Sequence, residues 1–177
     1  MEQKIIIAGF GGQGVVLAGN VLAQTALVEN KHVAAMVAYG VEMRGGTANC
    51  TVTISDEEIA SPVVDNPTIA IILNQQSLNK FEDLIEKDGL LLVNSSLIER
   101  GIRRTDIEVI KIPATDIANE LGNAKVANLI MVGAFVKKTN LLGLQNVVDT
   151  LTKAFPKHKQ DLIEINKNAL LKGASLV

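Results

Sequence analysis

The sequence predicts an α/β protein built on a doubly wound, mostly parallel sheet, with helices on both faces and a helical C-terminal region. Short apolar runs of strand length alternate with helix-like segments on short connections, a pattern typical of parallel βαβ units. Hydrophobic residues make up 47% of the 177 residues but aromatic residues only 3%, as in parallel strands buried under helices. The length fits one Rossmann-like domain, 1–177, in which residues from about 123 to 177 are helical.

The strands are recognised in two ways. The segment Ala48–Ser55 alternates apolar residues with threonines, which predicts a strand with one solvated face. The other strand-like runs are almost continuously apolar, which predicts strands buried on both faces. In chain order we expect strands at Lys4–Ala8, Val33–Ala38, Ala48–Ser55, Thr68–Leu73, Gly89–Val93 and Glu108–Ile112.

The helices are recognised by apolar residues at helical spacing and by end signals. Ser77 stands where an N-cap is expected, just ahead of such an apolar set. Pro156 separates the last two helical segments, and the strand signals stop before residue 123. We expect helices at Gln13–Val28, Ser77–Glu86, Pro113–Leu121, Val126–Lys138, Leu144–Phe155 and Lys157–Lys172.

Composition limits the classes of partner and the compartment. The net charge is −2 and no basic block interrupts the chain, which argues against a nucleic acid or an anionic membrane as partner. No apolar run reaches the length of a membrane span. The N-terminus enters a strand without a signal-peptide pattern, and the single cysteine suits a reducing compartment. We therefore expect a cytoplasmic protein.

Few residues are suited to metal or redox chemistry. The lone cysteine, Cys50, cannot form an internal disulfide or hold an iron–sulfur cluster, which typically needs four thiolates. It lies in mid-strand and is interpreted as a small buried hydrophobe. His32 and His158 are far apart and form no metal-ligand pair. The mean hydropathy of +0.26 predicts a subunit interface, in a hetero-oligomer or in a homodimer of the isolated chain.

Polar or glycine-rich segments follow four of the predicted strands. In open α/β sheets, ligands bind outside the carboxyl ends of the strands. We therefore expect these segments to meet at one binding site. They are Gly9–Gln13, Tyr39–Gly46, Asn74–Gln76 and Asn94–Ser96.

The first of these segments lies in the stretch IIIAGFGGQGVVLAG. Gly9, Gly11 and Gly14 match the G-x-G-x-x-G fingerprint, between a strand and a helix as required. Glycines permit positive φ and close backbone approach, and the helix N-terminus offers N–H groups to an anion. Gly12 adds a further glycine, and Gln13 is an amide that a turn alone does not require.

The fingerprint lacks its second half. A dinucleotide site needs an acidic residue about 20 residues later for the ribose, but the second strand ends in Val37-Ala38-Tyr39, and Glu42 comes only in a later loop. Three interpretations stay open. The glycines form a nicotinamide or flavin dinucleotide site, or only a tight strand–helix turn, or a site for another phosphate-bearing ligand or a partner chain.

The second segment, YGVEMRGG, sets one acid and one base between glycines. Arg44, beside Gly45 and Gly46, is placed to present its guanidinium to a phosphate or carboxylate. The alternative is an internal pair with Glu42 on a surface loop. Met43 is an interface contact or a loop-packing residue.

Asn74, Asn94, Ser95 and Ser96 are read in two ways. As turn and cap residues they would hydrogen-bond their own backbone. As site residues they would contact a ligand or a partner chain.

These segments carry a resemblance to a known family. The stretches GFGGQGVVLAG, YGVEMRGGTANCTVTISDEEIASPVV, LNQQSLNKFE and GLLLVNSSLI resemble the gamma subunit of 2-oxoacid:ferredoxin oxidoreductases of the 2-oxoglutarate, 2-ketoisovalerate and pyruvate types. The resemblance covers Ile5–Leu142, and its second stretch is its most specific part. The family's expected proline after Tyr39-Gly40 is replaced by Val41, which relaxes that loop.

The resemblance implies a function and a set of partners. Such enzymes oxidatively decarboxylate a 2-oxoacid to an acyl-coenzyme A. For this chain we expect the 2-oxoacid to be 2-oxoglutarate. The partners would be alpha, beta and delta subunits that carry thiamine diphosphate, Mg²⁺ and iron–sulfur clusters, with ferredoxin as electron acceptor. This chain alone would bind no cofactor, but it would share a coenzyme A site.

No residue set in the chain has the make-up of a nucleophile with its base, so we expect the isolated chain to be inactive. A free-standing NAD(P)-binding oxidoreductase and a purely structural assembly subunit are the alternatives. The candidate binding residues are Gly9, Gly11, Gly12, Gln13, Gly14, Tyr39, Glu42, Met43, Arg44, Gly45, Gly46, Asn74, Asn94 and Ser95.

Overall fold

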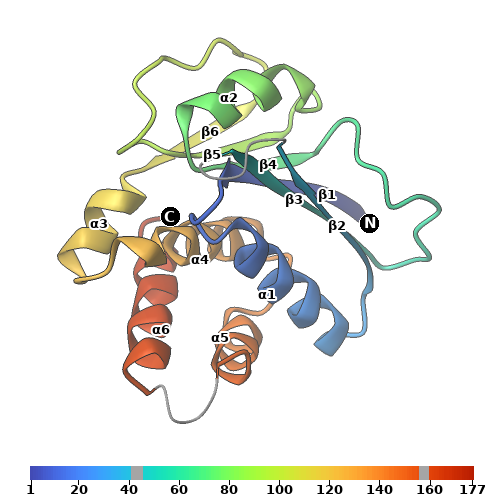
Figure 1. Ribbon diagram of the computed structural model, residues 1–177. Helices are drawn as coiled ribbons and strands as arrows, with labels where there is room; N and C mark the ends of the chain where they lie inside the picture. Colours follow the sequence, from blue (N-terminus) through green and yellow to red (C-terminus); the bar gives the residue numbers. More distant parts are fainter. Residues whose placement is uncertain (41–45, 156–159) are drawn as a thin grey trace.

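The structure is a computed structural model, which describes residues 1–40, 46–155 and 160–177. Six strands in this part of the chain form one sheet in the order β2-β3-β1-β4-β5-β6 (Figure 1). All of the predicted strands are present, each within two residues of its predicted ends. They are β1 (Glu2–Phe10), β2 (His32–Tyr39), β3 (Thr47–Ser55), β4 (Ile69–Ile72), β5 (Leu90–Asn94) and β6 (Glu108–Ile112).

The sheet is mixed but mostly parallel, as predicted. β3 runs antiparallel to both of its neighbours, β1 and β2, while the pairs β1–β4, β4–β5 and β5–β6 are parallel. Gly9 and Tyr39 both pair with Ala48, and Ile72 pairs with Ala8 on one side and Val93 on the other. The carboxyl ends of β1, β2, β4 and β5 therefore lie along one edge of the sheet.

The helices follow the predicted order with shifted ends. The first begins at Val15 rather than Gln13, because Gly14 takes a left-handed conformation that a helix cannot contain. The second begins at Gln75, two residues before the predicted start, and gives way to a 3₁₀ turn after Phe81. Residues 157–159, predicted to begin the last helix, lie outside the described residues. The helices are α1 (Val15–Val28), α2 (Gln75–Phe81), α3 (Ala114–Glu120), α4 (Ala127–Thr139), α5 (Leu144–Lys153) and α6 (Gln160–Ala174), with 3₁₀ turns η1 (Glu82–Leu84) and η2 (Ala124–Val126).

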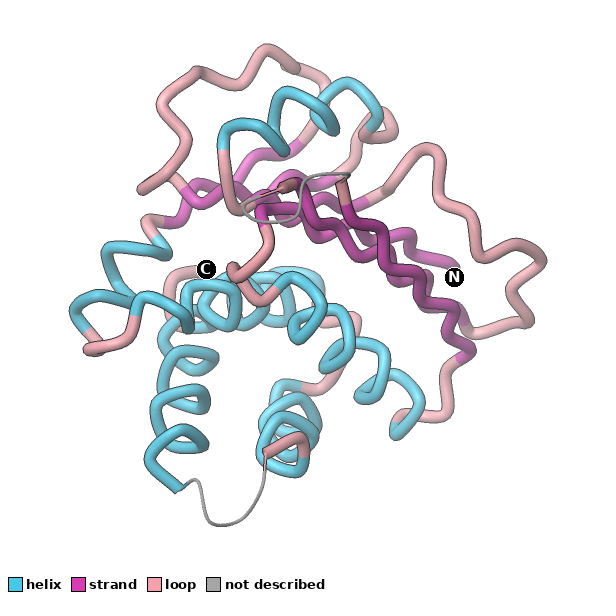
Figure 2. Tube along the Cα trace, viewed as in Figure 1, coloured by secondary structure: helices cyan, strands magenta, loops and turns pink. Residues whose placement is uncertain are grey.

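Helices cover both faces of the sheet, but unequally (Figure 2). On one face, α1 and α3–α6 bury a large core with side chains such as Ile5 and Ile7 of β1. On the other face, Ile6 and Ala8 of the same strand pack with α2, with Ile85 just after η1, and with the segment between β5 and β6. Successive side chains of a strand point to opposite faces, so a strand covered on both faces reads as a continuous apolar run.

The C-terminal helices form part of the larger core through a close crossing of α4 and α6. Gly133 of α4 lies against the carbonyl of Leu170, and Gly173 of α6 lies against the carbonyl of Ile130. A methyl group on either glycine would overlap these backbone atoms. In the described part of the chain no helix is both long and apolar enough to cross a membrane.

We expect Gly133→Ala to lower the free energy of unfolding by about 1–3 kcal/mol, the usual cost of overpacking a core. The helix backbone that blocks the added methyl group cannot rotate aside as a side chain would. Denaturant unfolding of the purified chain measures the loss. Gly101→Ala is the matched control, because a methyl group there meets no atom within 4 Å. Equal stability of the two variants would show that α4 and α6 have room to separate.

The N-terminus is tied to the end of β3 by a charged cluster. The Asp56 carboxylate pairs with the Met1 ammonium group at 2.9 Å and with the Lys31 ammonium group at 2.8 Å. Hydrogen bonds from Lys31 and from the N-terminus lower the pKa of Asp56 from 3.8 to about 2. A carboxyl group whose pKa is lowered by folding stabilises the fold only while it is ionised.

The contribution of Asp56 should therefore be complete above about pH 4 and should disappear as the pH falls towards 2. Asp56→Asn should flatten the acid side of a stability–pH profile measured by denaturant unfolding. Asp65→Asn, which changes an exposed acid in the same connecting segment, should leave the profile close to that of the unmodified chain. A stability–pH profile unchanged by Asp56→Asn would mean that the ion pairs of Asp56 contribute nothing to the free energy of unfolding.

Candidate functional site

The site lies at the edge where the four strands end. β1 leads into α1 on the large-core face, whereas β4 leads into α2 on the opposite face (Figure 1). Adjacent strands whose helices leave on opposite sides open a crevice between them, which is where doubly wound sheets bind ligands. An open crevice of about 460 Å³ lies at this point. Its lining residues are Phe10, Asn74, Gln75, Gln76 and Leu97.

The glycine loop contributes Phe10 to the crevice, and two of its glycines are required by the backbone. Gly12 has φ 108° and Gly14 has φ 73°, values that side-chain-bearing residues rarely adopt. Gly11 and Gly12 are exposed. The loop is closed by a hydrogen bond of 3.1 Å from the Gln13 N–H to the Phe10 carbonyl.

The second glycine segment reaches the first. The Gly11 N–H donates to the Gly46 carbonyl at 3.0 Å, and the Gly40 N–H donates to the Thr47 carbonyl at 2.7 Å. Tyr39, at the end of β2, is 70% exposed at the same edge. The candidates Glu42, Met43, Arg44 and Gly45, together with Val41, lie outside the described residues.

The Gln13 side chain turns back onto its own loop. Its Oε1 accepts from the Phe10 N–H at 2.9 Å and from Asn74 Nδ2 at 3.4 Å, and its Nε2 donates to the Leu73 carbonyl at 3.4 Å. A methyl group on Gly9 would overlap this amide. Gln13 therefore joins the end of β1 to the end of β4. Gly9 has no side chain, so the Gln13 amide can occupy the space beside it.

Asn74 and Asn94 also hydrogen-bond within the chain. Asn74 is the N-cap of α2, its Oδ1 accepting from the Ser77 N–H at 2.8 Å, so Ser77 is not the cap that was predicted. Asn94 is fully buried and donates to Thr115 Oγ1 at 2.8 Å and to the Leu73 carbonyl at 3.3 Å. The Ser95 N–H donates to the carbonyl of Ile112 at 2.8 Å. Asn74 is therefore a cap, whereas the Asn94 side chain bonds to other elements and not to its own local backbone.

The N-terminus of α1 opens beside this network. Gly14 is its N-cap, and no side chain among the described residues caps it. The first turn contains no acidic residue, and the first N–H groups of a helix have no partner within it. Backbone donors and the positive end of the helix dipole therefore face the edge of the sheet, an arrangement that favours an anion.

Asn128, in the first turn of α4, was not predicted as a site residue. Its Nδ2 donates to the Gly14 carbonyl at 2.9 Å. Its Oδ1 is buried and has no hydrogen-bond partner in residues 1–40, 46–155 and 160–177. Native proteins seldom leave such an atom unpaired, so a water molecule or a ligand donor is expected behind the loop.

Phe10 and Leu97 were also missed, because neither is a polar residue. Phe10 is 38% exposed and Leu97 39% exposed, and both line the crevice. The available signal was position: Phe10 stands inside the glycine fingerprint, and Leu97 directly follows the polar turn after β5. Together they give the crevice an apolar component beside its amides.

The described residues offer binding groups rather than reactive ones. Cys50 is fully buried against Gly19 of α1, and burial raises the pKa of its thiol, which suits the predicted structural role. No group of three or more His, Cys, Asp or Glu residues able to hold a metal ion occurs in the described ranges. The site presents backbone N–H groups, amides and a short apolar surface.

Comparison with known proteins gives a consistent result. Residues 4–176 match the family model described as pyruvate ferredoxin/flavodoxin oxidoreductase. The 2-oxoglutarate synthase subunit KorC of Methanocaldococcus jannaschii is 37% identical over 164 residues, covering 91% of this chain and 88% of that subunit. The ketoisovalerate oxidoreductase subunit VorA of Methanothermobacter thermautotrophicus is 37% identical over 98% of this chain, which spans 36% of that subunit's length.

Two solved structures share the fold. The gamma subunit of a keto/oxoacid ferredoxin oxidoreductase from Geobacter sulfurreducens is 26% identical, with a TM-score of 0.84 over 98% of this chain and 96% of that one. The 2-oxoglutarate:ferredoxin oxidoreductase from Magnetococcus marinus, with 2-oxoglutarate, coenzyme A and succinyl-CoA bound, is 21% identical. It has a TM-score of 0.90 over 99% of this chain and 31% of that one.

The glycine loop predicts a contrast between neighbouring substitutions. Gly12→Ala should destabilise the chain by about 1–2 kcal/mol, because an L-residue is strained at φ 108° although no atom lies within 4 Å of the added methyl group. Gly11→Ala should be nearly neutral, since its φ is not in that region and the nearest atom is 4.0 Å away. Thermal and denaturant unfolding of both variants measure the difference. A neutral Gly12→Ala would contradict the left-handed turn.

Proposed function

The chain belongs to the pyruvate ferredoxin/flavodoxin oxidoreductase family, and from this we propose that it is the gamma-type subunit of a 2-oxoacid:ferredoxin oxidoreductase. The assembled enzyme would convert 2-oxoglutarate and coenzyme A to the acyl-coenzyme A, with ferredoxin as acceptor. The choice of 2-oxoglutarate is supported by KorC, which the chain matches along most of that subunit's length, whereas VorA is a much longer chain. The whole complex would work in the cytoplasm.

We propose that this subunit helps to hold the phosphates of coenzyme A. The observation that carries the proposal is the exposed Gly11-Gly12 backbone, which leads from Phe10, a crevice-lining residue, to the N-terminus of α1, where no described side chain caps the helix. Close backbone approach and free N–H groups are what a phosphate needs. The unpaired Oδ1 of Asn128 beneath the same loop supports a bound group there.

Other parts of the site would bind the rest of the ligand and a neighbouring chain. The apolar side chains of Phe10 and Leu97 are suited to the less polar parts of coenzyme A. Tyr39 and the segment from Glu42 to Gly46, with Met43, Arg44 and Gly45, would add a charge and a partner contact. We assign thiamine diphosphate, Mg²⁺ and the iron–sulfur clusters to alpha, beta and delta partner subunits.

In this mechanism the chain binds and orients rather than reacts. Coenzyme A, when bound, supplies the thiol that takes up the acyl group. The N–H groups of Gly12, Gly14 and the first turn of α1 would fix its phosphates, because those of Gly11 and Gln13 already donate within the chain. Gln13 and Asn74 keep the ends of β1 and β4 together. Correct placement of one reactant relative to another is itself a large part of catalysis. The isolated chain should therefore be inactive.

Two alternatives differ in what they require. A free-standing NAD(P)-dependent oxidoreductase needs an acid at the end of β2 for the ribose, where this chain has Ala38 and Tyr39. A purely structural assembly subunit would use the glycine loops only for packing against a neighbour.

Reconstitution of the complex with Gly11→Val or Arg44→Ala tests the proposal. Gly11→Val covers the loop backbone without the strain of positive φ, and Arg44→Ala removes the one basic residue of the second segment. Arg44→Ala should raise the KM for coenzyme A by about tenfold, the cost of losing one charge-assisted hydrogen bond of about 1.5 kcal/mol. Gly11→Val should also raise this KM, because its side chain keeps the phosphate away from the loop backbone. The turnover rate and the KM for the oxoacid should change little.

Gly101→Ala, in an exposed segment between β5 and β6, serves as the control in the same complex. Normal assembly with an unchanged KM in both site variants would favour the purely structural alternative. Tight binding of NADH or NADPH by the purified chain, measured by titration, would favour the free-standing oxidoreductase.

A further inference from the structure

The connection between β5 and β6 differs from the other parallel crossovers of the sheet. Parallel strands are usually joined across a helix, but residues 95–107 contain no helix or strand. Ile98 and Ile102 of this connection pack onto the smaller core. Such a segment needs another source of order, because a loop leaves its backbone groups without regular partners.

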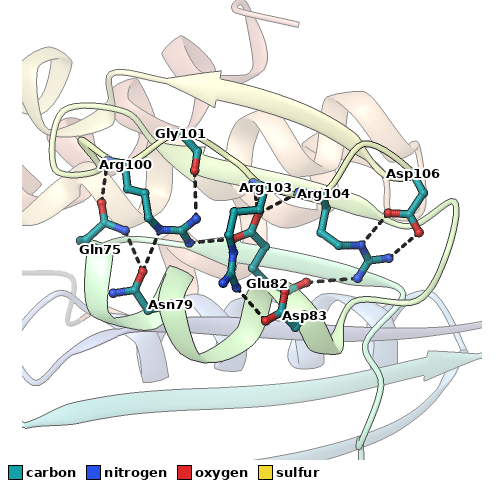
Figure 3. Close-up of polar contacts among 9 residues, drawn as sticks. All are labelled: Gln75, Asn79, Glu82, Asp83, Arg100, Gly101, Arg103, Arg104 and Asp106. Atoms are coloured by element: carbon teal, nitrogen blue, oxygen red, sulfur yellow. Dashed lines mark hydrogen bonds and ion pairs between the residues drawn. The ribbon is translucent and has the colours of Figure 1, made fainter.

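The source of order is a buried carboxylate (Figure 3). Glu82 of η1 is 0% exposed and accepts from the backbone N–H groups of Arg103 at 2.5 Å and Arg104 at 3.1 Å. It also pairs with the Arg100 guanidinium at 2.6 Å. Burial by itself raises the pKa of Glu82, but the hydrogen bonds from Arg100 and from the two backbone groups outweigh it, so the pKa is lowered. The carboxylate is therefore held ionised.

Arg100 extends this contact to the crevice. Its backbone N–H donates to Gln75 Oε1 at 2.9 Å, and its Nε donates to Asn79 Oδ1 at 2.9 Å. The Gln75 amide in turn donates to the same Asn79 oxygen at 3.1 Å. Gln75 is the first residue of α2 and one of the crevice-lining residues (Figure 3). The buried acid is thus connected to the crevice by a continuous chain of hydrogen bonds.

The same connection also supplies the opposite wall. It is fixed at its start by buried Asn94 and by the Ser95 N–H, which donates to the carbonyl of Ile112. Ser96 Oγ accepts from the Asp116 N–H at 3.1 Å, and the Leu97 N–H donates to the Asn94 carbonyl at 3.1 Å. The connection is fixed again at Arg100, so that residues 98 and 99 link Leu97 to this second anchor. Leu97, between these two anchors, lines the crevice together with Phe10.

We propose that Glu82, acting through Arg100, is a positioning residue that sets the shape of the crevice by holding both Gln75 and the segment that carries Leu97. The proposal rests on the proposed function, because it takes coenzyme A as the crevice ligand. Glu82 itself does not line the crevice. Its loss should weaken ligand binding without altering the chemistry on the partner subunits.

The test uses Glu82→Gln and the milder Arg100→Gln, which leaves Glu82 its two backbone donors and Arg103. Asp83→Asn is the matched control, since the exposed Asp83 carboxylate pairs with Arg103 in the same cluster but forms no hydrogen bond or ion pair with the side chains of Glu82 or Arg100. Each variant is assembled into the complex and assayed for turnover rate and for the KM values of coenzyme A and the oxoacid. Hydrogen exchange of residues 95–99 is measured on the full chain.

Arg100→Gln should raise the KM for coenzyme A by about threefold to tenfold, because a displaced wall binds the ligand less well, with kcat unchanged. Exchange at 95–99 should become faster, and Asp83→Asn should show neither effect. Glu82→Gln should act more strongly if it assembles. If Glu82 and Arg100 have only a structural role, Arg100→Gln should lower thermal stability but have the same KM for coenzyme A as Asp83→Asn. That result would overturn the proposal.

The outcome for Gly11→Val separates this proposal from the proposed function. If Gly11→Val raises the KM for coenzyme A and Arg100→Gln does not, the positioning role fails and the proposed function stands. If neither variant changes this KM, coenzyme A does not bind here and both fail. Unchanged exchange at 95–99 in Arg100→Gln would overturn the positioning role whatever the crevice binds.

Discussion

The fold at the binding edge depends on one backbone constraint, the left-handed conformation of Gly12 and Gly14. β1 is the central strand, hydrogen-bonded to both β3 and β4, and its chain must leave the sheet within a few residues to begin α1. Two positive φ values make this reversal possible. Because glycine caps α1, the N–H groups of the first turn have no side-chain cap among the residues that the structure describes. The same constraint therefore produces both the tight turn and the anion-binding end of the helix.

The amide side chains around this turn make the edge rigid. Gln13 and Asn94 both donate to the carbonyl of Leu73, which lies just beyond the end of β4. Their shared acceptor joins the ends of three neighbouring strands, β1, β4 and β5. A fixed arrangement of this kind lowers the entropic cost of binding, since fewer groups must be ordered when the ligand arrives. Glu82 and Arg100 extend the fixed region to the far wall of the crevice.

A site of this composition suits a subunit that binds a reactant and leaves the reaction to others. Backbone N–H groups and amides hold a ligand without ionising near neutral pH. The acid that is fully buried, Glu82, is occupied by arginine and backbone donors and lies away from the crevice lining. The site is supported by the larger core, which includes the close crossing of α4 and α6 at Gly133 and Gly173.

The sequence by itself determined the strands, the order of the elements and the edge at which the polar segments gather. Period and composition are local signals, and parallel strands bring their carboxyl ends together whatever the details. Only the tertiary structure decided the uses of individual side chains. In sequence, Asn74 and Asn94 could equally be ligand-binding amides, but in the fold Asn74 caps α2 and bonds Gln13, and Asn94 bonds Thr115. The roles of Phe10, Leu97 and Glu82 likewise depend on residues distant in the chain, because a crevice wall and a buried ion pair exist only once separate segments have packed together.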